Sequence, residues 1–589
     1  MPLGSALNSL LLLAKNLDTK NPTEMPVKKS DSDKPVVFPY GKEINYLPRD
    51  NPENHGYTKE YLESYFNELV SDFSVKPNRL LILKDDKVIA ERYEPPYVKD
   101  SWDCVFSSSK TLVALAIGFL YDEKKIELDT PAYKYIGNEK KIGNLKNKKI
   151  TVRHLLTMST GNSFNEMETA SSHKWVKSYF DSNLKFKVGT KFEYNSLNTY
   201  ILSVIVEKVA KEKFATFVRK RLFDPLGIND THLDTSPEGY FKGGWGLYIL
   251  PDDMARLGLL VKNNGVYEGK RILSEEWINL MSHKQFDATK FKHTLNYGFQ
   301  MWVDEANDMC AFNGMYDQDI FVYRRSGVVV VTCCADNEVF HTSNLFKITA
   351  KYFANEKMGE FPLCPYRANR DLRNEESLMY YYDLIANRDY KPISKLSNSC
   401  GILPVILQNE LGTYSKGVKG VYFKKEGTSY ALIVQEGHDK YEIAFDFDNG
   451  IRQIFKIYEN VFDCVCSARF ILSGKNEPLL IIRLFFLEFS SSRYFSIRFT
   501  KDPDVVSLEL SENPGFDFVM SLVEIQDEST KDFLFNLTKT IGHDYINGKI
   551  KNIFSPSFSL VHGESKIKKL LRIKDKKPVK KIETKKKEA

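Results

Sequence analysis

Apolar and polar positions near the start of the chain follow the pattern of a helix and then that of a hairpin. From Tyr57 to Phe73 the apolar side chains recur with helical spacing. Two short apolar runs follow, at Arg79–Lys84 and Val88–Tyr93, and the polar residues between them are typical of a tight turn. The pattern predicts one helix and then two paired strands.

The middle of the first 360 residues has the pattern of several helices. The run at 111–120 is apolar on nearly every side, which predicts a buried helix. Further helices are expected at 122–136 after a turn, at 150–161 behind a threonine cap, at 197–209 and at 251–263.

Strand patterns return before residue 335. The runs Met309–Asn313, Asp319–Tyr323 and Gly327–Cys334 are expected to be core strands. We expect the first and last strands of this region to pair in one antiparallel sheet, with the central helices as a second layer. The resulting fold class is α+β.

The pattern changes from Pro362 onward. A helix is expected over 372–387, and many short β-rich runs separated by turn residues follow from about 401 to 522, as in an all-β barrel or sandwich. The predicted organisation is a disordered leader (1–34), a first folded domain (35–360), a helical linker (361–400), a β-rich accessory domain (401–560) and a lysine-rich disordered tail (561–589).

Charge is distributed unevenly along the chain. Residues 566–589 hold 12 Lys/Arg and 3 Asp/Glu, a net of +9 within a total of +6, so the rest of the chain is at −3. A solvated tail is the favoured interpretation, and a weak contact with an anionic surface is the alternative. Because the tail lacks aromatic residues interleaved with its charges, no specific nucleic acid partner is expected.

Cysteine usage and the N-terminus favour a reducing compartment. The 8 cysteines are scattered without a C-x-x-C pair. Cys464 and Cys466 would share one face of a strand and could bind a metal, but free buried thiols are favoured, and no metal or other cofactor is expected. The apolar N-terminal run lacks a basic start and is too short to span a bilayer. We therefore expect a cytoplasmic protein, with a degenerate signal peptide as the alternative.

The strongest chemical signal lies at the start of the buried helix. Ser107 and Lys110 are three residues apart and share one helical face. Burial favours a neutral lysine, which can take the serine proton and so activate the hydroxyl for attack on a carbonyl. The same S-x-x-K spacing occurs at three other places, but there polar or basic sequence follows it. The alternative for Ser107 is a serine that only caps the helix.

Other landmarks in the right order resemble the serine β-lactamase-like hydrolases, a group with class C β-lactamases, D-alanyl-D-alanine carboxypeptidases and family VIII esterases. The resemblance extends in particular to the branch that contains 6-aminohexanoate-dimer hydrolase. The segments that carry it, besides Ser107–Lys110, are 91–97, 122–135, 151–161, 192–209, 243–260, 269–274 and 314–322. It implies a β-lactamase/transpeptidase-like domain, in which an antiparallel sheet flanked by helices is joined to a helical subdomain.

The resemblance also implies roles for individual residues. Ser107 would be the acylated nucleophile, Lys110 its base, and Tyr194 the group that passes protons to the leaving group and activates water. The backbone N–H groups of Ser107 and Met315 would form the oxyanion hole. The residues expected to bind substrate are Ser196, Gly314 and Tyr316. Trp245 could line the pocket, although packing is favoured for it, and His154 is expected to be structural.

Two motifs depart from the family pattern. The second reads Tyr194-Asn195-Ser196, where lactamases have Tyr-x-Asn, although Ser196 could still bond Lys110. The third reads Phe312-Asn313-Gly314, without the cation that would pair with a β-lactam carboxylate. Both changes argue against β-lactamase activity.

The favoured hypothesis is hydrolysis of a small-molecule or peptide-like ester or amide. The alternative is a non-catalytic binding or scaffold protein that keeps the fold. A weaker alternative gives the main role to the β-rich domain and tail, which would place the protein on a polymer or membrane. The sequence leaves the oligomeric state open.

Overall fold

The computed structural model describes residues 42–137, 144–169, 172–291, 295–336, 344–365, 374–393, 396, 400–411, 413–515 and 553–563. The predicted leader and residues 564–589 of the predicted tail lie outside this set. Within the described part of the chain, none of the helices has both the length and the hydrophobicity to cross a bilayer.

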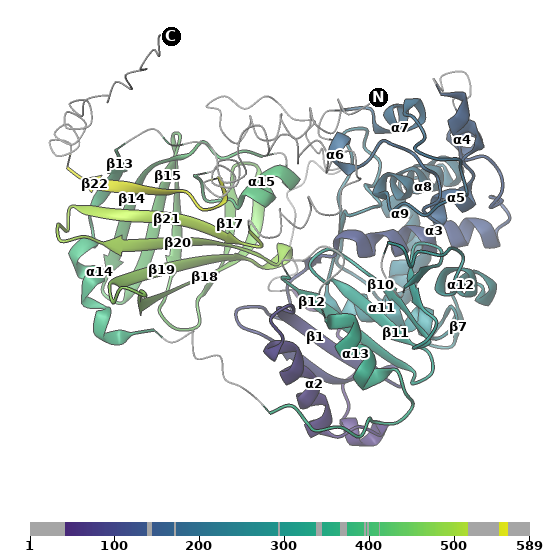
Figure 1. Ribbon diagram of the computed structural model, residues 1–589, viewed down its shortest axis with the longest axis horizontal. Coiled ribbons are helices and arrows are strands. Elements are labelled where there is room, and N and C mark those ends of the chain that lie inside the picture. Colours follow the sequence, from purple (N-terminus) through teal and green to yellow (C-terminus); the bar gives the residue numbers. More distant parts are fainter. Residues whose placement is uncertain are drawn as a thin grey trace, which may run out of the picture.

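A seven-stranded antiparallel sheet forms the centre of the first domain, in the order β2-β1-β12-β11-β10-β9-β8 (Figure 1). Its strands are β1 Pro77–Lys84, β2 Lys87–Tyr93, β8 Asn296–Tyr297, β9 Trp302–Asp304, β10 Met309–Phe312, β11 Asp319–Tyr323 and β12 Val328–Cys334. The tight turn between β1 and β2 has φ of 50° and 62° at Asp85 and Asp86, as hairpins with right-handed twist require. β1 also pairs antiparallel with β12, which confirms the expected closure between the two ends of the domain.

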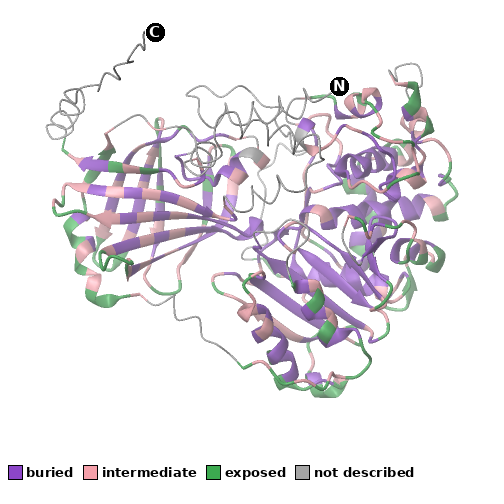
Figure 2. Ribbon diagram, viewed as in Figure 1, coloured by how far each residue is buried: buried purple, intermediate pink, exposed green. Residues whose placement is uncertain are grey.

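Helices cover both faces of this sheet. Alternate side chains of β1 point to opposite faces, so Leu80 and Ile82 pack with α2 (Lys59–Ser71) and α13 (Leu345–Phe353). Leu81 and Leu83 belong to the core on the other face, together with α11 (Pro251–Lys262). Burial on both faces explains why β1, β10, β11 and β12 are buried along almost their whole length (Figure 2).

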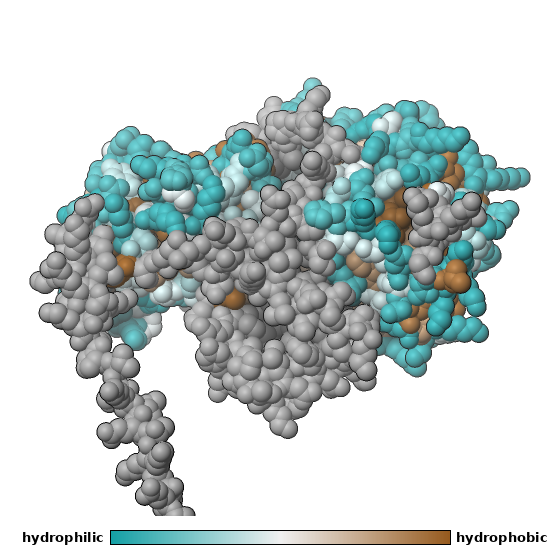
Figure 3. Space-filling view, turned by 90° about the horizontal axis from the view of Figure 1, so that it is seen from above, coloured by the Kyte–Doolittle hydropathy of each residue, from teal (hydrophilic) through white to brown (hydrophobic). Residues whose placement is uncertain are grey.

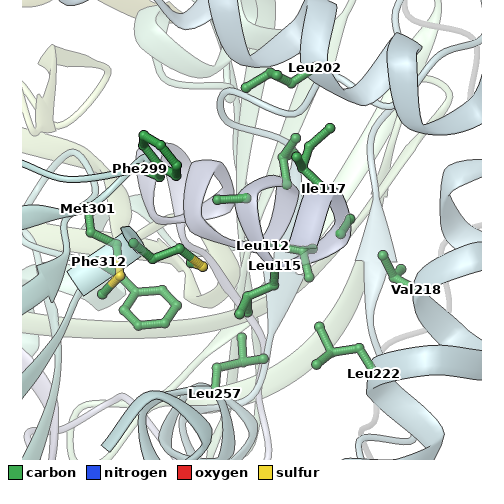
Figure 4. Packing of buried hydrophobic residues seen from close by; sticks show 14 of the residues in the cluster. Leu112, Leu115, Ile117, Leu202, Val218, Leu222, Leu257, Phe299, Met301 and Phe312 are labelled. Carbon is green, nitrogen blue, oxygen red and sulfur yellow. The ribbon is translucent and has the colours of Figure 1, made fainter. Parts of the chain in front are cut away.

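The helix α3 (Ser109–Asp122) runs through the middle of the helical part of the domain. Its apolar side chains lie among those of the neighbouring helices and of the sheet (Figure 4). A Cβ on Gly118 would lie 2.3 Å from the ring of Trp277, so the absence of a side chain there lets the helix α12 (Glu275–Ser282) approach closely. The surrounding helices are α4 Ala132–Ile136, α5 Val152–Leu156, α7 Trp175–Asp181, α8 Ser196–Ala210, α9 Phe214–Val218 and α12 Glu275–Ser282.

Shorter elements connect these helices and strands. A small sheet in the order β3-β5-β4 consists of β3 Asp103–Cys104, β4 His232–Leu233 and β5 Leu247–Ile249. The remaining elements of the first domain are η1 Pro52–His55, η2 Phe106–Ser108, η4 Leu145–Lys149, α6 Glu166–Thr169, η5 Arg219–Phe223, α10 Asp224–Leu226, β6 Val266–Tyr267 and β7 Lys270–Arg271.

The second domain is a ten-stranded antiparallel sheet curled into a near-closed barrel, in the order β16-β15-β14-β13-β22-β21-β20-β19-β18-β17 (Figure 1). Its strands are β13 Asp389–Pro392, β14 Val418–Glu426, β15 Ser429–Glu436, β16 Asp439–Phe445, β17 Ile451–Ile457, β18 Asn460–Leu472, β19 Pro478–Phe486, β20 Ser491–Phe499, β21 Val505–Asn513 and β22 Ser557–His562. The side-chain amide of Gln453 on β17 bonds both the carbonyl (2.8 Å) and the N–H (3.3 Å) of Ala444 on β16. This amide bridges the two edge strands, which decides between the barrel and the sandwich.

Three features of the second domain differ from the expected organisation, and the first is that β22 continues to His562, inside the range expected to be a disordered tail. β13 lies in the range expected to be a helical linker, and Tyr390 on it is buried in the barrel core. The helix expected over 372–387 is shorter, with η7 (Glu376–Leu378) followed by α14 (Tyr380–Ile385). A strand of four residues that ends in proline is too short to show a period of two, which explains why the pattern missed it.

One of the hydrophobic clusters extends across both domains. The cluster that fills the barrel continues into the first domain through Trp102, Phe106, Tyr248 and Tyr316. The same cluster includes Leu403 and Leu407, of which the second lies in α15 (Val405–Leu411). Seen from above, hydrophilic residues dominate the described surface and only small hydrophobic patches break it (Figure 3).

Candidate active site

The chain turns sharply at Ser107, between β3 and α3. The N–H of Val105 donates to Leu247 O at 3.0 Å, and Phe106 then takes a left-handed φ of 42°. The η2 turn follows, so Ser107 lies at the bend where the strand gives way to the buried helix. Such a turn displays a side chain that a continuous helix would bury.

Only one of the three consecutive serines has its hydroxyl available for chemistry. Ser108 Oγ donates to Gln318 O at 2.6 Å, and Ser109 Oγ accepts from the Leu247 N–H at 3.1 Å. Both of these residues are buried, whereas Ser107 is half-buried. The structure therefore gives Ser108 and Ser109 structural partners and leaves Ser107 beside Lys110.

Lys110 lies at the base of this turn. Its Nζ is 2.8 Å from Ser107 Oγ and donates to Gly244 O at 2.8 Å. Burial lowers the pKa of Lys110 to about 7, against the opposing influence of the negative charge of Glu166. A substantial share of the lysine is thus neutral near pH 7 and has a lone pair for the serine proton.

Tyr194 lies next to Ser107 and Lys110. In the chain it comes directly before Asn195, the N-cap of α8. Lys110 Nζ lies 4.8 Å from the centroid of its ring, and its hydroxyl bonds the side chain of Ser107. The ring stacks on Trp302 at 5.8 Å between centroids, which fixes its orientation. Burial, as the largest influence, raises the pKa of Tyr194 well above its usual value, so the phenol stays protonated at neutral pH.

The turn between β10 and β11 lies against the strand that leads to Ser107. A Cβ on Gly314 would lie only 2.3 Å from Val105 O, so no other residue fits this close approach. The turn is held by the side chain of Asp319, whose Oδ1 accepts from the Gly314 N–H at 3.0 Å and from Asn313 Nδ2 at 2.7 Å. Met315 is the next residue, so these contacts place it close to the turn at Ser107.

Two of the expected substrate-binding residues occupy unexpected surroundings. Tyr316 is 2% exposed, and its ring packs edge-on against Phe106 at 5.2 Å in the core shared with the barrel. Ser196 is buried, and its N–H donates to Glu166 Oε1 at 2.7 Å. Among the described residues, the side chain of Lys110 bonds Ser107 and Gly244, and the bond that Ser196 could have formed with it is not made.

Two residues near the centre were missed by the sequence reasoning. Gly244 supplies the carbonyl that holds Lys110, and the glycine-rich run from Lys242 to Gly246 was the available signal. Glu166 lies in the short helix α6 within a polar loop, and no pattern in the sequence marked it.

The structure also places the residues for which a structural role was favoured over a functional one. His154 forms a capping box with Thr151 at the start of α5, as expected of a structural residue. Trp245 is partly buried, and the centroid of its ring lies 5.8 Å from that of Trp175. The eight cysteines are free thiols, and across the described ranges no group of His, Cys, Asp and Glu side chains is arranged to hold a metal ion.

Comparison with known proteins identifies the first domain. Residues 79–345 match the Beta-lactamase family model. The chain is 27% identical over 218 residues to the 6-aminohexanoate-dimer hydrolase of Paenarthrobacter ureafaciens, a match that covers 34% of this chain and 55% of the relative. It is 26% identical over 134 residues to Protein flp of Staphylococcus aureus (strain N315), covering 22% of this chain and 27% of that protein.

These matches thus span about half of the first relative and about a quarter of the second. Among solved structures, a putative 6-aminohexanoate-dimer hydrolase from Bacillus anthracis aligns with a TM-score of 0.42 and 18% identity, over 58% of this chain and 92% of that one. The family resemblance expected from the motifs is confirmed: the chain contains a Beta-lactamase family domain.

Proposed function

We propose that this protein is a serine hydrolase that cleaves an ester or amide bond through an acyl-enzyme on Ser107. The observation that carries the proposal is the 2.8 Å separation between Ser107 Oγ and the Nζ of a buried lysine whose pKa is about 7. An alcohol beside a neutral amine is the pair that serine acyl transfer needs. The similarity to a 6-aminohexanoate-dimer hydrolase, which is a hydrolase by name, supports this reaction class.

In the acylation step, Lys110 Nζ takes the proton from Ser107 Oγ as the oxygen attacks the substrate carbonyl. The C–Oγ bond forms, and the negative charge moves to the carbonyl oxygen. The backbone N–H groups of Ser107 and Met315 stabilise this oxyanion. The bond to the leaving group then breaks, and Tyr194 passes a proton to the leaving atom and recovers one from Lys110.

Deacylation reverses the roles with water as the nucleophile. Water gives a proton to the Tyr194–Lys110 pair as its oxygen bonds the acyl carbon. The C–Oγ bond then breaks, and the proton returns to Ser107 Oγ, which restores the enzyme. No cofactor enters either step.

The third motif supports an ester or amide substrate over a β-lactam. Phe312 is 1% exposed, and the Asn313 side chain donates to Asp319. These two positions therefore present no positive charge to pair with a β-lactam carboxylate.

The test is labelling with a fluorophosphonate probe. We expect the wild type to be labelled on Ser107 and Ser107→Ala to remain unlabelled. The matched control is Ser171→Ala, which removes a serine at the same spacing from a lysine. A folded wild type that resists labelling, or labelling that survives Ser107→Ala, would contradict the proposal and favour the non-catalytic binding protein.

A further inference from the structure

Aromatic side chains gather around Tyr194, the residue proposed to pass a proton to the leaving group. The ring of Tyr194 stacks on that of Trp302, with 5.8 Å between centroids, and on that of Phe291, with 5.9 Å. The ring of Phe192 lies edge-on to that of Phe291 at 5.6 Å and tilted to that of Phe286 at 6.4 Å. These contacts join six rings into one aromatic cluster, which consists of Phe192, Tyr194, Phe286, Phe291, Tyr297 and Trp302.

The aromatic cluster has a buried floor and a partly exposed outer layer. Tyr297 on β8 and Trp302 on β9 form the floor at one edge of the seven-stranded sheet, and they are 1% and 2% exposed. Phe192, Phe286 and Phe291 lie above them on two loops and keep part of their surface exposed. A group of partly exposed rings that touch one another is typical of a surface that binds an apolar partner.

Backbone hydrogen bonds hold both loops in place. In the loop before α8, the N–H of Glu193 donates to Met158 O at 2.9 Å. In the loop after α12, the N–H of Phe286 donates to Tyr297 O at 2.9 Å, and its carbonyl accepts from the Tyr297 N–H at 3.0 Å. The rings are therefore arranged before any ligand arrives, which lowers the entropic cost of binding.

The chemistry of the aromatic cluster favours an uncharged ring as its partner. The acid that lies within the first loop, Glu193, is already paired with Lys185 at 2.6 Å. Lys110 Nζ already lies 4.8 Å from the ring centroid of Tyr194. A neutral aryl group that stacks on Phe291 or meets it edge-on removes apolar area from water and adds the favourable geometry of paired aromatic rings.

We propose that the aromatic cluster binds an aryl group carried by the leaving alcohol or amine of the substrate, with Phe291 and Phe192 as the contacts. This inference rests on the proposed function and narrows its substrate class. The side of the substrate follows from Tyr194, whose hydroxyl bonds the side chain of Ser107 and is proposed to protonate the leaving atom. The competing role for the cluster is structural, as packing that only orients Tyr194.

The test uses esters that gain one ring at a known place. Ethyl acetate, 2-phenylethyl acetate and 2-cyclohexylethyl acetate share one acyl group, and their alcohols have similar acidity. Ethyl propanoate and ethyl 3-phenylpropanoate place the same ring on the acyl side. For each ester two quantities are measured: kcat/KM, and the concentration that halves the rate of fluorophosphonate labelling.

We expect the wild type to prefer 2-phenylethyl acetate to ethyl acetate by about thirtyfold and to 2-cyclohexylethyl acetate by about threefold. The ring on the acyl side should raise kcat/KM by no more than about threefold. Phe291→Leu and Phe192→Leu keep an apolar side chain without a ring, so each should lower the ratio of phenyl to cyclohexyl ester toward 1. The ratio is taken within one variant, so a change in its overall rate cancels.

The matched control is Phe499→Leu, which removes a partly exposed ring from β20 of the barrel and should leave the ratio unchanged. If the wild type labels but neither measurement shows a preference for the ring on the alcohol, or if the ratio survives both Phe291→Leu and Phe192→Leu, the cluster only orients Tyr194. A larger gain from the ring on the acyl side would overturn its placement beside the leaving group. A folded protein that neither labels nor hydrolyses any of these esters contradicts the proposed function itself, and this inference with it.

Discussion

Burial is the main cause of the shifted pKa values of Lys110 and Tyr194. Lys110 is 1% exposed, and loss of hydration shifts its pKa from 10.5 to about 7. Tyr194 moves in the opposite direction, because burial penalises its phenolate. One environment thus produces a base that is neutral and an acid that keeps its proton at the same pH.

The first prediction concerns pH. If neutral Lys110 is the base, protonation below its pKa removes activity, so kcat/KM for a neutral p-nitrophenyl ester should rise with pH through about 7 and level off above it. The measurement is a pH–rate profile between pH 5 and 9 on a substrate without ionisable groups. A flat profile over this range would exclude Lys110 as the base.

The second prediction concerns the identity of the amine. Lys110→Arg keeps a positive charge that stays protonated at every working pH, so kcat should fall by about 10³-fold. Lys185→Arg is the matched control, because Lys185 has the same spacing from Ser182. Activity of Lys110→Arg near the wild-type level would show that the lysine only fills space.

At the scale of elements, the site depends on how closely two backbone segments approach. The end of β10 lies against Val105, and only glycine at 314 allows this contact. The obstacle for a side chain is a backbone carbonyl, which cannot move aside as a flexible side chain could. A side chain added at position 314 would therefore displace the backbone at Val105, just before Ser107.

The third prediction follows from that contact. Gly314→Ala should destabilise the protein by about 1–3 kcal/mol through overpacking and lower the rate of fluorophosphonate labelling by about 100-fold. Gly474→Ala is the matched control, since a Cβ there meets nothing within 4 Å. Thermal unfolding and labelling of both variants check the prediction, and a labelling rate unchanged in Gly314→Ala would contradict it.

The fourth prediction concerns the residues at the end of β10 and the hydrolysis of a β-lactam. Because Phe312 and Asn313 bring no cation, turnover of nitrocefin should be negligible under conditions where p-nitrophenyl esters are hydrolysed. Absorbance assays of both substrates on one preparation test this. Nitrocefin hydrolysis at a rate comparable with that of the esters would overturn the interpretation of the third motif.

At the scale of the whole molecule, the barrel is attached to the strand β3, which leads to Ser107. Arg79 on β1 bonds both oxygens of Asp103 at 2.7 Å and also donates to Leu487 O of the second domain at 3.3 Å. Phe489 packs edge-on against Tyr248 at 5.6 Å. Since Asp103 lies four residues before Ser107, the barrel supports the position of the turn at Ser107.

The fifth prediction tests this support. Phe489→Ala at the domain contact and Phe423→Ala inside the barrel should each destabilise the protein by about 3–5 kcal/mol. Only Phe489→Ala should also slow labelling of the folded protein, by about tenfold. The measurement is the rate of labelling of each variant well below its unfolding temperature. Equal rates in the two variants would show that the domain contact does not affect the site.

The sequence alone predicted several elements of the first domain and named Ser107, Lys110 and Tyr194 as candidates for its site, but it did not predict strands such as β8 and β9. Periodicity showed the hairpin of β1 and β2, the buried helix behind Ser107 and the return of β11 and β12, because the period depends only on which faces of a segment meet the core. The ordered motifs were enough to assign the family.

Tertiary structure decided what depends on contacts distant in sequence. The carbonyl of Gly244, the proximity of Glu166 and the contact of Tyr316 with the barrel core join segments that no local pattern relates. The lowered pKa of Lys110 is of the same kind, because desolvation is set by everything packed around the amine and not by its neighbours along the chain.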